Sequence, residues 1–265
     1  MSEKKLAGHF FAFEEAPGFG GAFVDLKHIC LELRRRGVRV TIARTYEDAC
    51  WEPLVEAGCT LLSHPRFDAA QRLWAKQRGT RRTRMAVYGL EQLTINLPTG
   101  VWYGAWARRN GVTAVFCNNS FTRNTAGVVA ARIAGCPLYS YHQGTQDGTG
   151  GYKQMLPYVD YIFTVSEYVR NIELTFGPDP AICETLYPGV DPVPDPALAL
   201  PRADDGRVRV GMVGVFTAWK GHLAFLDAFA RVAKAAPNAD AWLFGKPLPK
   251  EPETLTAIKA RIVEL

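Results

Sequence analysis

The sequence has 265 residues, of which 48% are hydrophobic and 22% charged, and its formal net charge is +5. These proportions are typical of a globular protein and exclude the low-hydrophobicity composition of a disordered chain. No stretch reaches the roughly 18 uninterrupted apolar residues of a membrane span, and the N-terminus shows no small-residue cleavage site. We therefore expect a cytoplasmic protein whose length accommodates two domains.

Six cysteines occur, and no two of them are closer than nine positions. This spacing excludes a CxxC zinc site or thioredoxin-type pair. We expect buried, reduced thiols, as is usual in the cytoplasm. The cysteines are Cys30, Cys50, Cys59, Cys117, Cys136 and Cys183.

In the first part of the chain, strand patterns alternate with helical ones. An apolar strand precedes a glycine-rich loop and a helix that ends in three arginines and Gly37, a favourable C-terminus. Ser166 is the expected N-cap of a later helix. The alternation predicts an α/β fold with a parallel sheet. We expect strands at residues 8–13, 38–43, 113–117, 137–141, 159–165 and 182–186, and helices at 122–134 and 166–176.

A proline-rich segment, residues 188–205, follows these elements and predicts an extended linker. We therefore place the first domain at residues 1–187 and a second α/β unit at residues 206–265. So small a unit would leave a sheet edge bare, and its last helix has no terminal cap, so we expect a fragment or half of a split protein. The second unit should contain a buried strand at 208–213, helices at 220–235 and 253–265, and a strand at 239–244.

Two glycine-rich turns each lead from a strand into a helix, an arrangement that lets backbone amides approach a phosphate. The first contains Gly18, Gly20 and Gly21. A dinucleotide fingerprint would need another glycine at Phe23, so these glycines are equally consistent with a plain tight turn. The second turn runs from Gly214 to Lys220 and Gly221, and it lacks the spacing of a P-loop. A lysine beside a helix N-terminus suits a diphosphate, although it is also compatible with a solvated loop.

Three blocks of sequence resemble the GT-B glycosyltransferases, specifically the retaining family 4 group that uses nucleotide-sugar donors. The last block, with its glycine turn, lysine and helix, is the most specific. The blocks are FGGAFVDLKHICLELRRRGVRVTI, FTVSEYVRNIELTFG with ICETLYPGVD, and VGMVGVFTAWKGHLAFLDAFARVAKAAPNADAWLFG.

This resemblance implies two Rossmann-like domains, with the second holding most of the donor. It implies that Lys220 and His142 are catalytic: Lys220 would neutralise the departing diphosphate, and His142 would face the donor sugar. Asp191 would form a turn. No metal or other cofactor is expected. The residues implied to border the donor diphosphate are Gly20, Gly21, Gly214, Lys220 and Gly221.

The sequence departs from the family pattern at several positions. Val215 stands where the family often has an arginine, a second cation for the diphosphate, and Pro188 replaces the usual asparagine of a turn. The paired-glutamate segment that contacts the donor sugar in the family has no counterpart in these 265 residues.

A basic run at residues 72–84 contains Arg78, Arg81 and Arg82 and no acidic residue. Such a run suits an anionic membrane surface or a phosphorylated acceptor, and it also suits a solvated helix face. If the partner is a membrane surface, we expect the protein to make peripheral contact with the inner membrane face. No nucleic-acid partner is expected, because no binding motif accompanies the basic residues.

The sequence thus predicts a glycosyltransferase that moves a sugar from a nucleotide-diphosphate donor to an acceptor glycan, lipid or protein, with retention of configuration. The alternative is a truncated or split non-catalytic subunit that needs a partner to complete the donor site. A Rossmann oxidoreductase is disfavoured by Phe23 and by Ala43 and Arg44, where an acidic residue would end the second strand.

Overall fold

The computed structural model describes residues 6–15, 20–47, 49–64, 81–145, 151–190, 205–247 and 251–265, and the side chains of four residues early in α4 are excluded. The chain forms two compact units, Met1–Asp191 and Pro192–Leu265, called unit 1 and unit 2 below. Residues 191–204 of the predicted linker lie outside the description.

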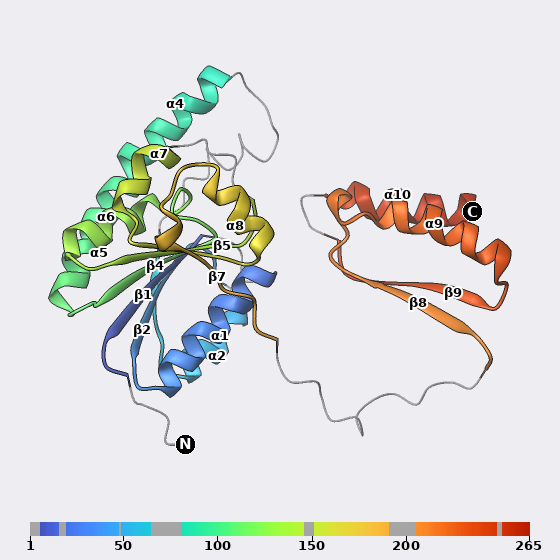
Figure 1. Ribbon diagram of the computed structural model, residues 1–265, viewed down its shortest axis with the longest axis horizontal. Helices are drawn as coiled ribbons and strands as arrows, with labels where there is room; N and C mark the ends of the chain where they lie inside the picture. The colour runs from blue at the N-terminus through green and yellow to red at the C-terminus, as the bar shows by residue number, and fades with distance from the viewer. Residues whose placement is uncertain are drawn as a thin grey trace. The chain divides into compact units, whose positions relative to one another are not determined.

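Unit 1 contains a seven-stranded, entirely parallel sheet with the order β3-β2-β1-β4-β5-β6-β7 (Figure 1). Strand β1 lies between β2 and β4, and its Phe11 is in register with both Thr41 and Val115. The strands are β1 (His9–Glu14), β2 (Arg39–Arg44), β3 (Thr60–Ser63), β4 (Ala114–Asn118), β5 (Leu138–His142), β6 (Tyr161–Thr164) and β7 (Cys183–Thr185).

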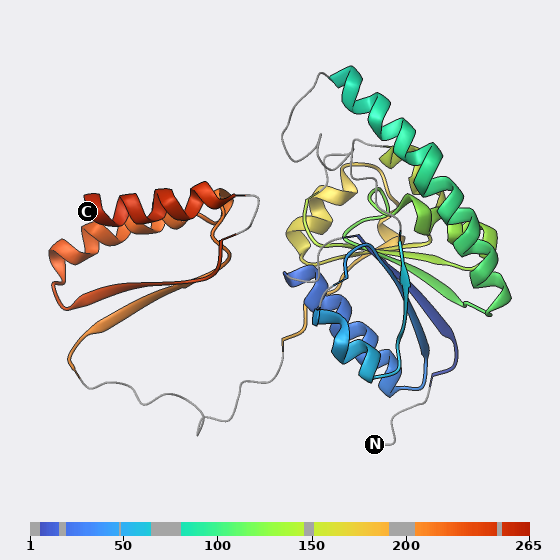
Figure 2. The same ribbon diagram turned by 180° about the vertical axis from the view of Figure 1, so that it is seen from behind.

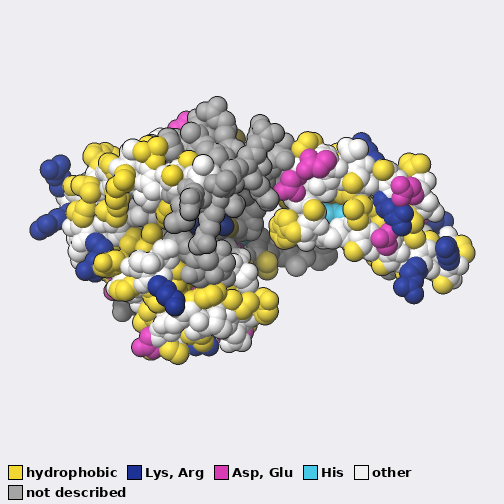
Figure 3. Space-filling model, turned by 90° about the horizontal axis from the view of Figure 1, so that it is seen from above, with side chains coloured by type: hydrophobic (Ala, Val, Ile, Leu, Met, Phe, Trp, Pro, Cys, Tyr) yellow, Lys and Arg dark blue, Asp and Glu magenta, His cyan; other side chains and the backbone are white. Residues whose placement is uncertain are grey.

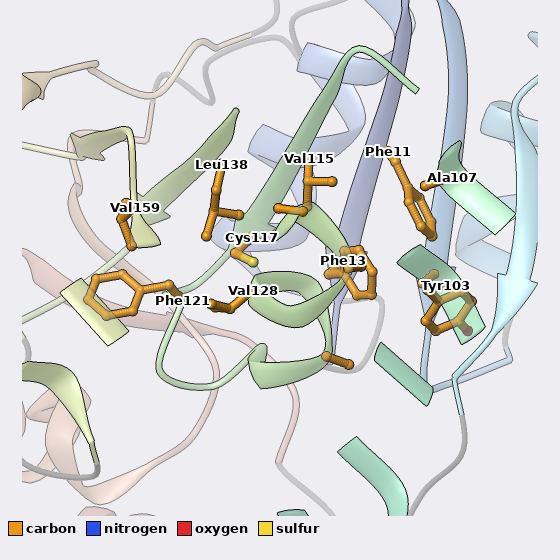
Figure 4. Close-up of a cluster of buried hydrophobic side chains, with 14 of the residues drawn as sticks. Phe11, Phe13, Tyr103, Ala107, Val115, Cys117, Phe121, Val128, Leu138 and Val159 are labelled. Carbon is orange, nitrogen blue, oxygen red and sulfur yellow. The ribbon is translucent and has the colours of Figure 1, made fainter. Parts of the chain in front are cut away.

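Helices cover both faces of this sheet, so its strands are apolar on both sides, as parallel strands usually are. Alternate residues of β1 point to opposite faces of the sheet: Ala12 packs in a cluster with residues of α1 and α2. Phe11 and Phe13 pack on the other face, in a cluster with residues of α5 and α6 (Figure 4). The helices of unit 1 are α1 (Gly21–Arg35), α2 (Glu52–Glu56), α4 (Arg81–Glu91), α5 (Leu97–Arg109), α6 (Thr125–Ala134), α7 (Tyr152–Met155) and α8 (Glu167–Leu174).

The strands and helices predicted for unit 1 are present, with ends that differ by a few residues. Ser166 caps α8 as expected, because its hydroxyl accepts a hydrogen bond from the Val169 amide at 3.2 Å. Residues 81–109, which show no clear pattern in the sequence, form one continuous helical stretch in which a π-helical turn, Gln92–Asn96, joins α4 to α5. Pro98 in the first turn of α5 lacks the amide proton that a regular helix would use, which accounts for the irregular turn before it.

Unit 2 contains two parallel strands, β8 (Val208–Val213) and β9 (Ala239–Phe244), and the helices α9 (His222–Ala235) and α10 (Pro252–Glu264). Both helices lie on the same face of the strands (Figure 2). They enclose a small core of Phe216, Leu226 and Ile258, with Leu243 and Leu255 packed against it.

The prediction that residues 208–213 form a buried strand is wrong in one respect: the strand exists, but every residue of it except Met212 is exposed. A two-stranded sheet with helices on only one side leaves its other face without cover. That other face carries Val213, Trp242 and Phe244, all exposed. In contrast, the helical side of unit 2, seen in Figure 3, mixes charged side chains with hydrophobic ones.

Candidate functional site

The carboxyl ends of β1 and β4 mark the centre of the candidate site in unit 1. The strand order reverses here, since the chain runs from β1 through β2 to β3 on one side and continues from β4 to β7 on the other. Open α/β sheets bind their ligands at such a switch point, outside the carboxyl ends of the strands. The residues that follow β1 and β4 are therefore the first to consider.

The first glycine turn lies at this edge. Gly20 has a φ of 107°, which favours glycine, and it precedes Gly21, the first residue of α1. Apart from the immediate chain neighbours, no atom of the described residues lies within 4 Å of where a Cβ would stand at either position. The first-turn amides of a helix have no intrahelical acceptor, and α1 has no acidic residue in that turn. These amides can therefore bind an anion. Gly18, the other glycine of this turn, lies outside the described residues.

A buried carboxylate joins the two central strands at the same edge. Glu14 is fully buried at the end of β1, and it accepts hydrogen bonds from the side-chain amides of Asn118 and Asn119, the latter at 3.1 Å. The Asn118 amide also donates to the carbonyl of Ala22 in α1, at 3.0 Å. Asn118 thereby joins the start of α1 to β4, and Glu14 joins both to β1. We did not predict this residue, although an acid directly after an apolar strand is a usable signal.

The loop after β4 is held in an unusual backbone conformation. Asn119 has a φ of 67° and Ser120 a φ of 148°, values that non-glycine residues rarely adopt. The side-chain amide of Asn124 stabilises the loop, because it donates to the carbonyls of Asn118 and Ser120, each at 2.7 Å. Strained backbone of this kind is concentrated at functional sites, which supports the carboxyl edge as the candidate site.

A second group of titratable side chains lies next to Glu14. Burial, followed by the charges of Glu91 and Glu14, raises the pKa of Glu15 to about 8, and Arg123 opposes this shift. His64 lies 4.0 Å from the Glu15 carboxylate (Nε2 to Oε1), and burial lowers the pKa of this histidine to about 4. Near neutral pH a protonated Glu15 can therefore donate a hydrogen bond, and a neutral His64 can accept one.

The structure buries His142 completely at the end of β5. Its Nδ1 lies 2.9 Å from Oε2 of Glu173, at ion-pair distance, and its Nε2 lies 3.0 Å from the hydroxyl of Ser140. Tyr152 donates a hydrogen bond to the other oxygen of the buried Glu173. Nε2 is thus hydrogen-bonded within the protein and Nδ1 faces the Glu173 carboxylate, and the implied contact of His142 with a donor sugar stays a prediction.

The second glycine turn belongs to unit 2. Gly221 has a φ of 79° and is the N-cap of α9, and Lys220 precedes it at the end of a short 3-10 turn, Ala218–Lys220. The Lys220 ammonium lies 4.1 Å from the ring centroid of Trp219, a cation–π contact on an exposed indole. A Cβ at Gly245 would lie 1.9 Å from the carbonyl oxygen of Gly214, so the close approach of the two chain segments requires glycine at position 245.

The predicted site residues thus fall into two groups. Gly20 and Gly21 lie at the carboxyl edge of unit 1, and the other diphosphate candidates (Gly214, Lys220, Gly221) share one turn in unit 2. Of the predicted basic surface, Arg78 lies outside the described residues, as do the side chains of Arg81 and Arg82 at the start of α4.

Known proteins resemble this chain both in sequence family and in fold. The family model described as Glycosyltransferase Family 4 matches residues 19–193, which include Gly20, Gly21 and every strand of unit 1 except β1. The chain belongs to glycosyltransferase family 4. No curated protein sequence matches the chain. Among the described helices of this family 4 chain, none is long and apolar enough to cross a membrane.

Solved structures resemble the family 4 chain in fold. HepE from Anabaena, crystallised with UDP and glucose, is 17% identical with a TM-score of 0.68, and the alignment covers 97% of this chain and 66% of HepE. A glycosyltransferase from Rickettsia africae is 14% identical with a TM-score of 0.72, with 97% and 65% covered. A UDP-N-acetylglucosamine 2-epimerase (putative) from Listeria monocytogenes is 10% identical with a TM-score of 0.57, with 96% and 66% covered. The predicted GT-B α/β fold is thereby confirmed, and the chain spans just under two thirds of the length of these proteins.

Proposed function

We propose that this family 4 chain takes part in transferring a sugar from a nucleotide-diphosphate donor to an acceptor hydroxyl, with retention of configuration. In this reaction the bond between the anomeric carbon and the diphosphate oxygen breaks, and its electron pair stays on the diphosphate. The acceptor oxygen bonds to the anomeric carbon on the same face, and its proton passes to the departing phosphate oxygen. The likeness to HepE, whose structures contain UDP and UDP-glucose, supports a nucleotide-sugar donor.

The observation that carries this proposal is the glycine turn of unit 2. It brings the Lys220 side chain and the N-terminus of α9 to one place, and the first turn of that helix contains no acidic residue. A helix N-terminus and an ammonium both favour an anion. Negative charge that develops on the diphosphate as the sugar leaves would be stabilised there, which is how preorganised donors accelerate such reactions. We propose that this stabilisation needs no metal ion.

Replacement of Lys220 tests the role of this turn. Lys220→Ala should lower the rate of sugar transfer about 100-fold, because loss of one preorganised charge donor typically costs that much. Lys220→Arg should retain more activity, since it keeps the charge. Lys234→Ala, in the last turn of α9, is the matched control and should have little effect. The assay is transfer from a panel of nucleotide-sugars. If Lys220→Ala matched the control variant, the turn would not stabilise the leaving group.

For the acceptor side, we propose that unit 1 associates with an anionic membrane surface. Exposed apolar side chains recur at spacings of three and four along α4, the π-helical turn and α5, and the basic run 72–84 precedes or overlaps their start. This pattern is that of a helix lying in a membrane interface. Hydrophobic side chains are visible over the corresponding side of unit 1 in Figure 3. The exposed residues are Leu90, Leu93, Leu97, Val101 and Trp102. The protein should co-sediment more strongly with phosphatidylglycerol vesicles, which are anionic, than with phosphatidylcholine vesicles. Equal binding to both would contradict the proposal that the membrane surface must be anionic.

A second candidate is a non-catalytic subunit whose donor site is completed by another polypeptide segment. The exposed face of β8 and β9 favours it, because large apolar side chains such as Trp242 and Phe244 are usually covered. Donor-dependent transfer by the purified 265-residue chain alone would rule this candidate out.

A further inference from the structure

Two buried polar side chains in the glycine turn of unit 2 have no partner within the described part of the protein. His222 is 2% exposed, and neither of its ring nitrogens has a hydrogen-bond partner there. Thr217 is 1% exposed, and its hydroxyl is likewise unpaired. Buried polar groups are nearly always hydrogen-bonded, and leaving one unsatisfied costs about 1–3 kcal/mol. Two such groups in one short turn therefore need an explanation.

The His222 ring is fixed by its surroundings and directed toward the turn. It packs edge-on against Phe216, with 5.1 Å between the ring centroids and an interplanar angle of 83°. A Cβ built on Gly214 would lie 4.0 Å from Nε2 of His222 and 3.9 Å from Cδ of Lys220. The imidazole edge and the lysine side chain thus meet over the same glycine.

The chemistry of this place selects an anion. The amides at the start of α9 give it partial positive charge, Lys220 adds a full charge, and an imidazole N–H and a hydroxyl are donors. Because Gly214 carries no side chain, a ligand can come close to the backbone.

We propose that His222, with Thr217, binds the diphosphate of the donor directly: an imidazole N–H and the threonine hydroxyl each donate a hydrogen bond to a phosphate oxygen beside Gly214. This assignment rests on the proposed function, and it adds two binding residues to the turn. It also accounts for the missing partners of both side chains, because a bound phosphate would accept their hydrogen bonds.

Calorimetric titration of the 265-residue chain with UDP and with inorganic pyrophosphate tests the proposal. His222→Phe keeps the ring packed on Phe216 and removes both nitrogens, and it should weaken binding of each probe about tenfold or more, as expected for loss of a hydrogen bond to a charged group. Thr217→Val should act in the same direction. Lys234→Ala is the control and should bind like the unsubstituted chain. Circular dichroism melting establishes that the variants are folded.

The outcomes distinguish this proposal from the function on which it rests. Weak binding by both Lys220→Ala and His222→Phe is the expected result. If Lys220→Ala binds weakly while His222→Phe binds normally, the assignment of His222 is overturned and the donor site stands. If the unsubstituted chain binds neither probe, both are overturned. Should His222→Phe fail to fold, the imidazole nitrogen resonances of the unsubstituted chain decide instead: pyrophosphate should shift the His222 signals, and unchanged signals would overturn the assignment.

Discussion

Replacement of Glu15 by glutamine should stabilise the protein at alkaline pH and leave it nearly unchanged in acid. Burial and the neighbouring charges of Glu91 and Glu14 raise the pKa of Glu15 from 4.5 to about 8. Because this pKa is raised on folding, the folded chain holds a proton that the unfolded chain has already lost between these two values. The stability of the natural protein therefore falls as pH rises from about 4.5 to about 8.

The size of the effect follows from the shift and from the exposure of the side chain. Each unit of pKa corresponds to about 1.4 kcal/mol, but 33% of the Glu15 side chain is exposed and solvent screens the charge. We therefore expect Glu15→Gln to raise the free energy of unfolding by only about 2 kcal/mol at pH 8.5, well below the unscreened value.

Urea unfolding followed by fluorescence, at pH 5 and pH 8.5, measures this difference. Glu56→Gln, at an exposed position of α2, is the matched control and should show no such dependence on pH. The free energies of unfolding of Glu15→Gln and of the natural chain are compared at both pH values. If they differed by the same amount at pH 5 and at pH 8.5, Glu15 would not be ionising within a cluster of acids, and the electrostatic description of this edge would be wrong.

Three further predictions concern packing, the buried histidine and the reaction. Gly104→Ala should destabilise unit 1 by about 1–3 kcal/mol, because its Cβ would lie 2.6 Å from Cβ of Ile133. Gly89→Ala, whose Cβ would have no atom of the described residues within 4 Å, should stabilise slightly, and equal effects of the two variants on the melting temperature would contradict this. Glu173→Gln should cost roughly 3 kcal/mol in urea unfolding, since it leaves the buried His142 without its carboxylate, and a loss below about 0.5 kcal/mol would argue against the pair. Sugar transfer should persist in excess EDTA, and loss of activity that Mg²⁺ restores would refute a metal-independent reaction.

The candidate site could be predicted only in part. The two glycine turns are visible in the sequence because a glycine-rich loop between an apolar strand and an amphipathic helix has a local signal. Glu14 and Glu15 follow an apolar strand, which is a local signal, but their contacts could not be predicted, because Asn118 and Glu91 are distant in sequence. The family resemblance singles out His142, but its pairing with Glu173 could not be predicted, because the histidine ends β5 and the carboxylate lies on α8.

By itself, the sequence determined the elements whose signals are local: the alternation of strands and helices, the Ser166 cap, and the turns that enter α1 and α9. The tertiary structure decided which surfaces those elements bury. The glycines at positions 100 and 104 permit close packing of α5 on α6, the helical stretch around Pro98 forms despite its irregular pattern, and β8 is exposed although its sequence is that of a buried strand. The physical reason is that hydrogen bonds within a helix or a turn join near neighbours in sequence, whereas burial depends on which distant segments pack against an element.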